Sequence, residues 1–142
     1  MRILEVTEYS EEVLDALNNL LPQLLETVSP LTVEDLEEII QSESSHLLMV
    51  ELNGSYVGSL TLTAVKIPTG IKAWIEDVVV SEKTRGRGVG RHLVKHAVGM
   101  AGNLGAQTVS LTSGPSRVAA NKLYKKLGFG PIETNVYRYK SS

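Results

Sequence analysis

Apolar residues in the first part of the chain recur every three or four positions, a spacing that predicts helices. A short strand, MRILEVT, precedes them, and Ser10 can cap the helix that follows. The apolar stripe of this helix consists of Val13, Leu14, Leu17, Leu20 and Leu21. Pro22 should kink or split the helix, with QLLETV continuing its apolar face. A second helix is predicted within SPLTVEDLEEIIQSE, with Thr32 as its cap.

The hydrophobic period then changes to alternation, which predicts strands. HLLMVEL, YVGSLTLTAV and AWIEDVVV follow one another along the chain, and Asn53-Gly54 between the first two is typical of a hairpin turn. Three consecutive antiparallel strands favour an α+β fold over a plain repeat of strand–helix–strand units.

After the third of these strands, helices and strands alternate. A glycine-rich loop leads into a helix whose buried face is Val89, Leu93, Ala97, Ala101 and Leu104. The strand AQTVSLT follows this crossover helix, so we expect it to lie parallel to AWIEDVVV. The segment SGPSRVAANKLYKKLGF predicts another amphipathic helix, stopped by Gly128 in the C′ position, and NVYRYK is the expected final strand.

Composition limits the classes of protein that remain. The 142 residues, 42% hydrophobic and 21% charged, predict one globular domain over residues 1–142. The absence of cysteine excludes disulfides, thiolate metal sites and a cysteine nucleophile. No apolar run approaches the roughly 20 residues of a membrane span, and no signal-peptide pattern opens the chain. We therefore expect a cytoplasmic protein that does not bind membranes.

Charge is divided unevenly along the chain. Residues 1–52 hold 12 acids and one base, a net charge of −11, whereas residues 53–142 hold 13 bases and 4 acids, a net charge of +9. Together these give the overall charge of −2, which does not favour a nucleic-acid binder. The division is compatible with two solvated faces, or with an anion-binding half and a half that attracts cations.

The most informative stretch is RGRGVG, Arg85 to Gly90. A Walker loop requires Gly-Lys-Ser/Thr at its end, but Gly90 is followed by Arg91-His92. A Rossmann fingerprint requires G-x-G-x-x-G in the first strand–helix unit and an acid about 20 residues later. Here the spacing is G-x-G-x-G, and no acid lies between Glu82 and Glu133. Both nucleotide-binding classes are thus disfavoured.

A third pattern fits. Arg85-x-x-Gly88-x-Gly90, between a strand and an amphipathic helix, resembles the acetyl-CoA loop of the GNAT N-acetyltransferases. The segment AANKLYKKLGF matches a later signature of the same family, and the order of elements agrees over essentially the whole chain. The resemblance implies an α+β GNAT fold, with a mixed, mostly antiparallel sheet of about 6–7 strands, about 4 helices and a splayed parallel strand pair.

The resemblance also implies an acetyl-CoA cosubstrate and the residues that bind it. Glycines let a pyrophosphate approach the backbone amides at a helix N-terminus, where unpaired N–H groups and the helix dipole favour an anion. A strand edge can pair with the amides of the pantetheine arm. The expected cofactor-binding residues are Val78, Val79, Val80, Arg85, Gly86, Arg87, Gly88, Val89, Gly90, Arg91, Asn121 and Tyr124.

Acetyl transfer to a primary amine needs a base, an oxyanion donor and an acid for the leaving thiolate. By resemblance, Tyr124 is the general acid and Glu76 the base, acting through water, with Asp77 as the alternative base. Strand alternation places Glu76 with Val78 on one face and Asp77 with Val79 on the other, unless a bulge exchanges the faces. The oxyanion donor is the backbone N–H of Val78 or Val79. Without a cysteine nucleophile, we expect direct attack by the amine in a ternary complex.

Other residues point less clearly to chemistry. His92 and His96 have a spacing that can bind metal, but no third ligand accompanies them, and we expect no metal. Trp74 can pack in the core or line the acceptor pocket.

The acceptor amine is not fixed by these patterns. WIEDVVVSEKTRGRGVG resembles a segment of glucosamine-6-phosphate N-acetyltransferases, yet the segment is too widely shared to identify a substrate. Acids clustered at Glu34, Asp35, Glu37 and Glu38 favour a cationic acceptor, either a small molecule or a peptide or protein amine. An acyl-CoA-binding sensor or regulatory module is the alternative function, and the resemblance is compatible with a homodimer.

Overall fold

The computed structural model describes residues 1–25 and 29–141, and its contacts divide the chain into two compact units. The first unit, Met1–Thr112, contains every strand in the described residues. The second, Ser113–Ser142, contains one helix. The prediction of a single domain stays a prediction.

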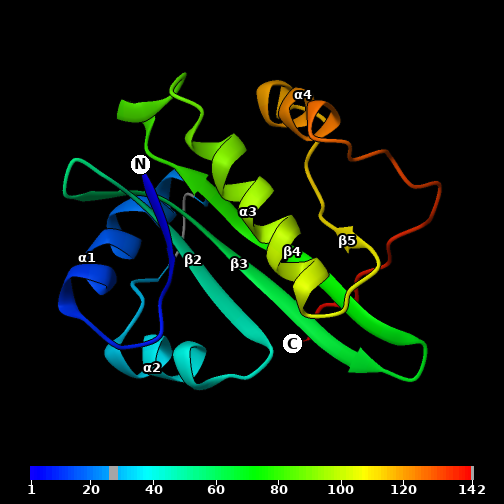
Figure 1. Cartoon of the computed structure of the whole chain (residues 1–142), viewed down its shortest axis with the longest axis horizontal. Helices are drawn as coiled ribbons and strands as arrows, with labels where there is room; N and C mark the ends of the chain where they lie inside the picture. The colour runs from blue at the N-terminus through cyan, green and yellow to red at the C-terminus, as the bar shows by residue number, and fades with distance from the viewer. Residues whose placement is uncertain (26–28, 142) are drawn as a thin grey trace. The chain divides into compact units, whose positions relative to one another are not determined.

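One mixed sheet forms the centre of the first unit (Figure 1). Its strands, in spatial as well as chain order, are β1 (Arg2–Glu5), β2 (Ser45–Leu52), β3 (Ser55–Ile67), β4 (Gly70–Val80) and β5 (Val109–Ser110). The first four pair antiparallel, and β5 pairs parallel to β4, as the sequence predicts. The mixed sheet and the parallel pair at its edge confirm the expected fold class.

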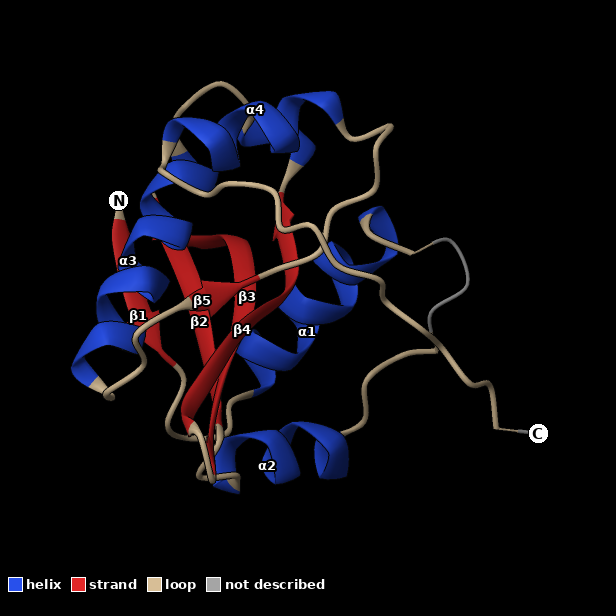
Figure 2. Ribbon diagram, turned by 90° about the vertical axis from the view of Figure 1, so that its right-hand side faces the viewer, coloured by secondary structure: helices blue, strands red, loops and turns tan. Residues whose placement is uncertain are grey.

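Helices cover both faces of the sheet. Figure 2 shows α1 (Glu11–Leu20) and α2 (Val33–Gln41) on one face and α3 (Val89–Asn103) on the other. The face under α1 carries a core that includes Val13, Leu17 and Met49. On the opposite face the start of α3 packs closely on β3, where a Cβ at Gly58 would lie 3.1 Å from Val89 Cγ1. We call these the α1 face and the α3 face.

The first two helices begin where the sequence predicts. The Ser10 hydroxyl accepts a hydrogen bond from the Val13 N–H at 3.2 Å, and Thr32 forms a capping box with Asp35. Hydrogen bonding to Thr32 lowers the pKa of Asp35, because the cap stabilises the carboxylate. Pro22 ends α1 as expected, with a 3₁₀ turn, η1 (Leu21–Gln23), at the break. The continuation predicted over QLLETV is not helical at Leu24 and Leu25, and residues 26–28 lie outside the described residues.

Two strand predictions need correction. The predicted strand 106–112 is reduced to β5, because only Ala73↔Val109 and Trp74↔Ser110 pair with β4. The predicted strand 135–140 is absent, since these residues join no strand in the described chain and their side chains are exposed. The described residues therefore form a sheet of five strands, not about 6–7.

Candidate active site

A bulge interrupts β4 at the predicted catalytic position. The register runs from Thr61↔Glu76 to Ser59↔Val79, so two steps on β3 oppose three steps on β4. The extra residue is accommodated at Asp77, whose φ of 53° is in the left-handed region. A bulge of this kind re-aims the side chains that follow it and leaves part of the backbone unpaired with the neighbouring strand.

The bulge changes which side chains of β4 share a face. Ser59 and Thr61 lie two residues apart on β3 and therefore on one face, so their partners Val79 and Glu76 share that face as well. Val79 belongs to the core under α1, which identifies this as the α1 face. The alternation that pairs Glu76 with Val78 is thus wrong, and the bulge is the reason.

Trp74 and Glu76 are neighbours on the α1 face. Glu76 is exposed and Trp74 is half-buried, so Trp74 is not a core residue. Opposite Trp74 on β3 lies Thr63, whose Oγ1 donates to the Trp74 carbonyl at 3.4 Å. A carboxylate and an aromatic ring therefore line the same surface beside the bulge.

The edge of β4 is open along its C-terminal half. β5 pairs with β4 only at Ala73 and Trp74, and within the described residues no strand pairs with this edge from Ile75 to Val80. An unpaired strand edge offers N–H and C=O groups to an extended ligand. Val78, Val79 and Val80 lie on this stretch, as the resemblance implies.

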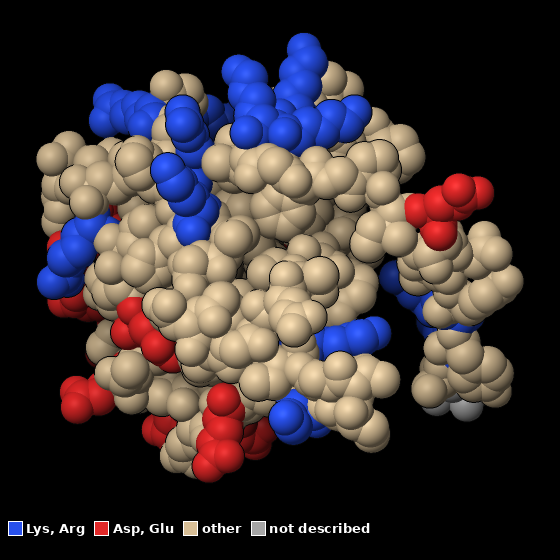
Figure 3. All heavy atoms as spheres, turned by 45° about the vertical axis from the view of Figure 1, so that its right-hand side comes forward, with Lys and Arg blue, Asp and Glu red and all other residues tan. Residues whose placement is uncertain are grey.

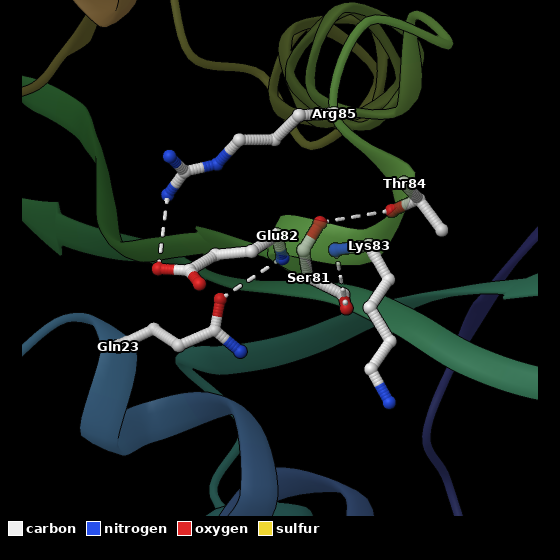
Figure 4. A network of polar contacts seen from close by, with 6 residues as sticks. All are labelled: Gln23, Ser81, Glu82, Lys83, Thr84 and Arg85. Carbon is white, nitrogen blue, oxygen red and sulfur yellow. Dashed lines mark hydrogen bonds and ion pairs between the residues drawn. The ribbon is translucent and has the colours of Figure 1, made fainter.

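A compact turn joins β4 to the glycine-rich loop (Figure 4). The Ser81 hydroxyl accepts from the Lys83 N–H at 3.4 Å, and the Ser81 carbonyl accepts from the Thr84 N–H and hydroxyl at 3.0 and 3.1 Å. These bonds build the 3₁₀ turn η2 (Glu82–Thr84). Thr84 is buried, which anchors the turn under the loop.

The loop beyond η2 carries backbone donors without partners. The Arg87 N–H donates to the Thr84 carbonyl at 3.4 Å, but the N–H groups of Gly86, Gly88, Val89, Gly90 and Arg91 have no partner among the described residues. The first helical bond of α3 is His92 N–H to Gly88 C=O at 3.1 Å. Gly86 and Gly88 have φ of 83° and 76°, and no atom lies within 4 Å of a Cβ built at Gly86. The loop is therefore an open cradle of N–H groups at a helix N-terminus, which suits a pyrophosphate.

Basic side chains surround this cradle. Lys83, Arg85, Arg87 and Arg91 are all exposed, and Arg85 makes a single long contact of 4.0 Å with Glu82. Figure 3 shows a group of lysine and arginine side chains gathered at the top of the face drawn. The exposed guanidinium groups of Arg85, Arg87 and Arg91 can therefore bind an anion at the loop.

The second unit holds the other two predicted site residues, both on α4 (Val118–Lys126). Gly128 ends this helix with φ of 100°, the C′ position predicted for it. The Phe129 N–H donates to the Tyr124 carbonyl at 3.0 Å and the Gly128 N–H to the Lys125 carbonyl at 3.1 Å, which together form a Schellman motif. The rings of Phe129 and Tyr124 meet edge to face at 5.9 Å. The LGF sequence thereby fixes the orientation of Tyr124.

The two side chains differ in their surroundings. Tyr124 is buried, and burial raises the pKa of its phenol, with Arg117 opposing the shift. The phenol is therefore neutral at pH 7 and has a proton to donate. Asn121 donates its side-chain N–H to the Gly114 carbonyl at 3.0 Å, which holds the start of the unit against the helix.

Some features of the site were not predicted from the sequence. The capping role of Ser81 had a detectable signal, because serine commonly accepts from the backbone two or three residues later. The left-handed Asp77 had only a weak signal. The Glu82 N–H also donates to Gln23 Oε1 at 3.1 Å, and this contact had no signal in the sequence. Among the described residues, no group of three His, Asp or Glu side chains is arranged to bind a metal. In the same residues, no helix combines the length and hydropathy needed to cross a bilayer.

Comparison with known proteins gives the class. Residues 12–129 match the model of the acetyltransferase (GNAT) family. The chain belongs to this family and is an N-acetyltransferase, a kind of acyltransferase. Members of the family use acetyl-CoA.

Two curated relatives come from Bacillus subtilis (strain 168), and both are described as uncharacterized N-acetyltransferases. YhdJ is 33% identical over 109 residues, which are 75% of this chain and 75% of YhdJ. YobR is 36% identical over 66 residues, which are 46% of this chain and 27% of YobR. The chain thus spans only about a quarter of YobR.

Solved structures share the fold over their whole length. A putative acetyltransferase from Agrobacterium tumefaciens str. C58 has a TM-score of 0.88 at 25% identity, covering 99% of this chain and 100% of that chain. A transcriptional regulator from Bacillus halodurans C-125 has a TM-score of 0.81 at 25% identity, covering 98% and 99%. AAC(6')-Iy in complex with the bisubstrate analog CoA-S-monomethyl-acetylneamine has a TM-score of 0.83 at 19% identity, covering 99% and 98%, and supports the fold alone.

Proposed function

We propose that this chain transfers the acetyl group of acetyl-CoA directly to a primary amine in a ternary complex. The observation that carries the proposal is the loop from Gly86 to Arg91, where five backbone N–H groups lack partners in the described chain. This cradle directly follows a strand whose edge is open and whose bulge displays Glu76. The residues proposed to bind acetyl-CoA and the residue proposed to activate the amine would therefore both lie on β4 or directly after it.

The donor would be held in two places. The unpaired amides of the loop and the side chains of Arg85, Arg87 and Arg91 suit the phosphates of coenzyme A. The open edge at Val78, Val79 and Val80 suits the amides of the pantetheine arm, which can pair with it like an added strand. We propose, from the family resemblance, that Asn121 and Tyr124 also contact the cofactor, near its thioester.

The residues divide the proton chemistry between them. Acetyl-CoA supplies the thioester carbonyl that the amine attacks. Glu76 accepts a proton from the amine through water, because a lysine-like amine with a pKa of about 10.4 is otherwise protonated at pH 7. Tyr124 donates a proton to the departing sulfur. The N–H of Val78 or Val79, next to the bulge, donates to the acetyl oxygen as negative charge develops on it.

For the acceptor we propose a cationic amine, in a small molecule, a peptide or a protein. The acids of α2 at Glu34, Glu37 and Glu38 are exposed, and they belong to the strongly acidic first part of the chain. Trp74 and Glu76 together suit an ammonium group, since an aromatic face and a carboxylate both attract cations. An acceptor range restricted to neutral or phosphorylated amines would contradict this choice.

A binding function without turnover is the second candidate. One solved relative is described as a transcriptional regulator, which favours an acyl-CoA sensor. The buried, neutral phenol of Tyr124 favours the enzyme instead, because a sensor needs no proton donor.

We also propose that the protein forms a homodimer through residues 130–141. The side chains of Val136, Tyr137 and Tyr139 are 76%, 87% and 93% exposed, although their residue types prefer a buried strand. Light scattering that gives the monomer mass across micromolar concentrations would exclude the dimer.

The deciding experiment measures free thiol released from acetyl-CoA across a panel of amines. Amine-dependent release supports the acetyltransferase, and coenzyme A binding without release supports the sensor. Parallel lines in double-reciprocal plots, the sign of a ping-pong mechanism, would contradict direct transfer.

A further inference from the structure

Gln23 reaches from the end of α1 to the turn that opens the glycine-rich loop (Figure 4). It is the last residue of η1, and its Oε1 accepts a hydrogen bond from the Glu82 N–H at 3.1 Å. The partners are 59 positions apart in the sequence. The bond therefore ties the segment after α1 to the loop after β4.

Glu82 is the one residue of the turn whose N–H depends on a distant partner. The N–H groups of Lys83 and Thr84 are satisfied by Ser81, and that of Arg85 reaches the Glu82 carbonyl at 3.5 Å. These local bonds set the shape of the turn. The Ser81 N–H donates to the Val57 carbonyl at 2.7 Å, which ties the turn to β3, and the bond from the Glu82 N–H to Gln23 ties it to the segment after α1.

We propose that Gln23 is a positioning residue for coenzyme A, which holds the glycine-rich loop in the orientation that presents its N–H groups to the phosphates. This inference rests on the proposed function. Without the Gln23 acceptor, water satisfies the exposed Glu82 N–H, and the turn keeps its shape and its bond to β3 but loses its tie to the segment after α1. The binding-competent orientation is then populated for a smaller fraction of time, and the apparent affinity falls by that fraction.

Two substitutions separate the hydrogen bond from the bulk of the side chain. Gln23→Met keeps the length but removes the acceptor, and we expect coenzyme A to bind about three- to fivefold more weakly by calorimetry. Gln23→Glu keeps an oxygen acceptor and should restore most of the affinity. The measurements are made at about 0.5 M salt, where the Debye length of about 4 Å screens the added charge.

Asn18 provides a matched control. Its Oδ1 accepts from the Leu31 N–H at 2.7 Å and its Nδ2 donates to the Leu31 carbonyl at 3.1 Å, so it too joins α1 to a distant backbone segment. It does not contact the turn. Asn18→Leu should lower the melting temperature and leave the coenzyme A affinity unchanged, whereas Gln23→Met should change the affinity more than the melting temperature.

The outcomes distinguish this inference from the proposed function. If the unmodified protein fails to bind coenzyme A, the proposed function is wrong. If it binds, and Gln23→Met binds equally well, the positioning role is overturned. Equal weakening by Gln23→Glu and Gln23→Met, or by Asn18→Leu and Gln23→Met, would overturn it as well.

Discussion

Glu76 and Asp77 are adjacent carboxylates that the backbone places in different settings. Glu76 pairs with Thr61 in regular register, beside Trp74 on the α1 face, whereas Asp77 is the left-handed residue of the bulge. Aspartate tolerates that conformation better than most residues, because its short side chain can bond to the local backbone. The left-handed backbone of the bulge thus accounts for an aspartate at position 77. This leaves Glu76 as the preferred candidate for the base.

Exchange of the two carboxylates tests this assignment. We expect Glu76→Gln to lower kcat by about 10²- to 10⁴-fold, the usual contribution of a general base, with little change in coenzyme A affinity. Asp77→Asn keeps the left-handed preference and should lower kcat far less. Steady-state turnover of the two variants, measured beside their coenzyme A affinity by calorimetry, checks the role. A larger loss in Asp77→Asn would reverse the assignment.

Tyr124, the proposed general acid, also affects stability through its burial. Its folded pKa is raised above the unfolded value of about 10, so its contribution to stability is complete below that pH and is lost as pH rises through the folded pKa. We expect the unmodified protein to lose stability relative to Tyr124→Phe as pH increases past about 10, measured by urea unfolding. The same variant should have lower kcat at all pH values if the phenol is the acid. Unchanged turnover would exclude that role.

Among the elements, the sequence predicts best those whose signals are local. The caps at Ser10 and Thr32, the break at Pro22 and the stop at Gly128 all depend on residues within one turn, and all are confirmed. The GNAT fold also follows from the motifs.

The features that shape the site are less visible in the sequence. The bulge lies in a run, EDVVV, whose only mark of an extra residue is the weak one of an aspartate at position 77. The short β5 pairs with β4 at only two positions, although the residues AQTVSLT have the pattern of a longer strand. Both are tertiary effects, so the candidate site could be located by its motifs but its geometry could not.

Gly128 offers a test at the level of the helix end. An alanine there must adopt φ near 100°, which costs roughly 1–2 kcal/mol for a residue with a Cβ. We expect Gly128→Ala to lose about that much stability and to lower kcat, because the Schellman motif aligns the rings of Phe129 and Tyr124. Gly99→Ala is the control. It lies inside α3 with no atom within 4 Å of the new methyl group, and it should be neutral or stabilising by up to about 1 kcal/mol. Equal losses in both variants would argue against the motif.

For the whole molecule, charge division predicts a salt-dependent donor affinity. Residues 53–142, which include the loop, carry a net charge of +9, and coenzyme A is an anion with several phosphate charges. We expect coenzyme A to bind several-fold more weakly at about 0.5 M than at about 0.05 M salt, because screening shortens the range of the attraction. Dephospho-coenzyme A, without the 3′-phosphate, should show a shallower dependence. Identical salt dependence for the two ligands would indicate that the basic side chains do not contact that phosphate.

The open edge of β4 also allows ligand binding to be followed by hydrogen exchange of the protein's own backbone amides. In the part of the chain that the structure describes, no strand protects the backbone amides between Ile75 and Val80 that point away from β3, whereas β3 protects those paired with it. In deuterated solvent we expect this stretch to contain fast- and slow-exchanging amides in close succession. A ligand that adds itself as a strand should slow only the fast set, even if it is never turned over. Protection confined to those amides would reveal donors with acyl groups other than acetyl, before any acceptor amine is known.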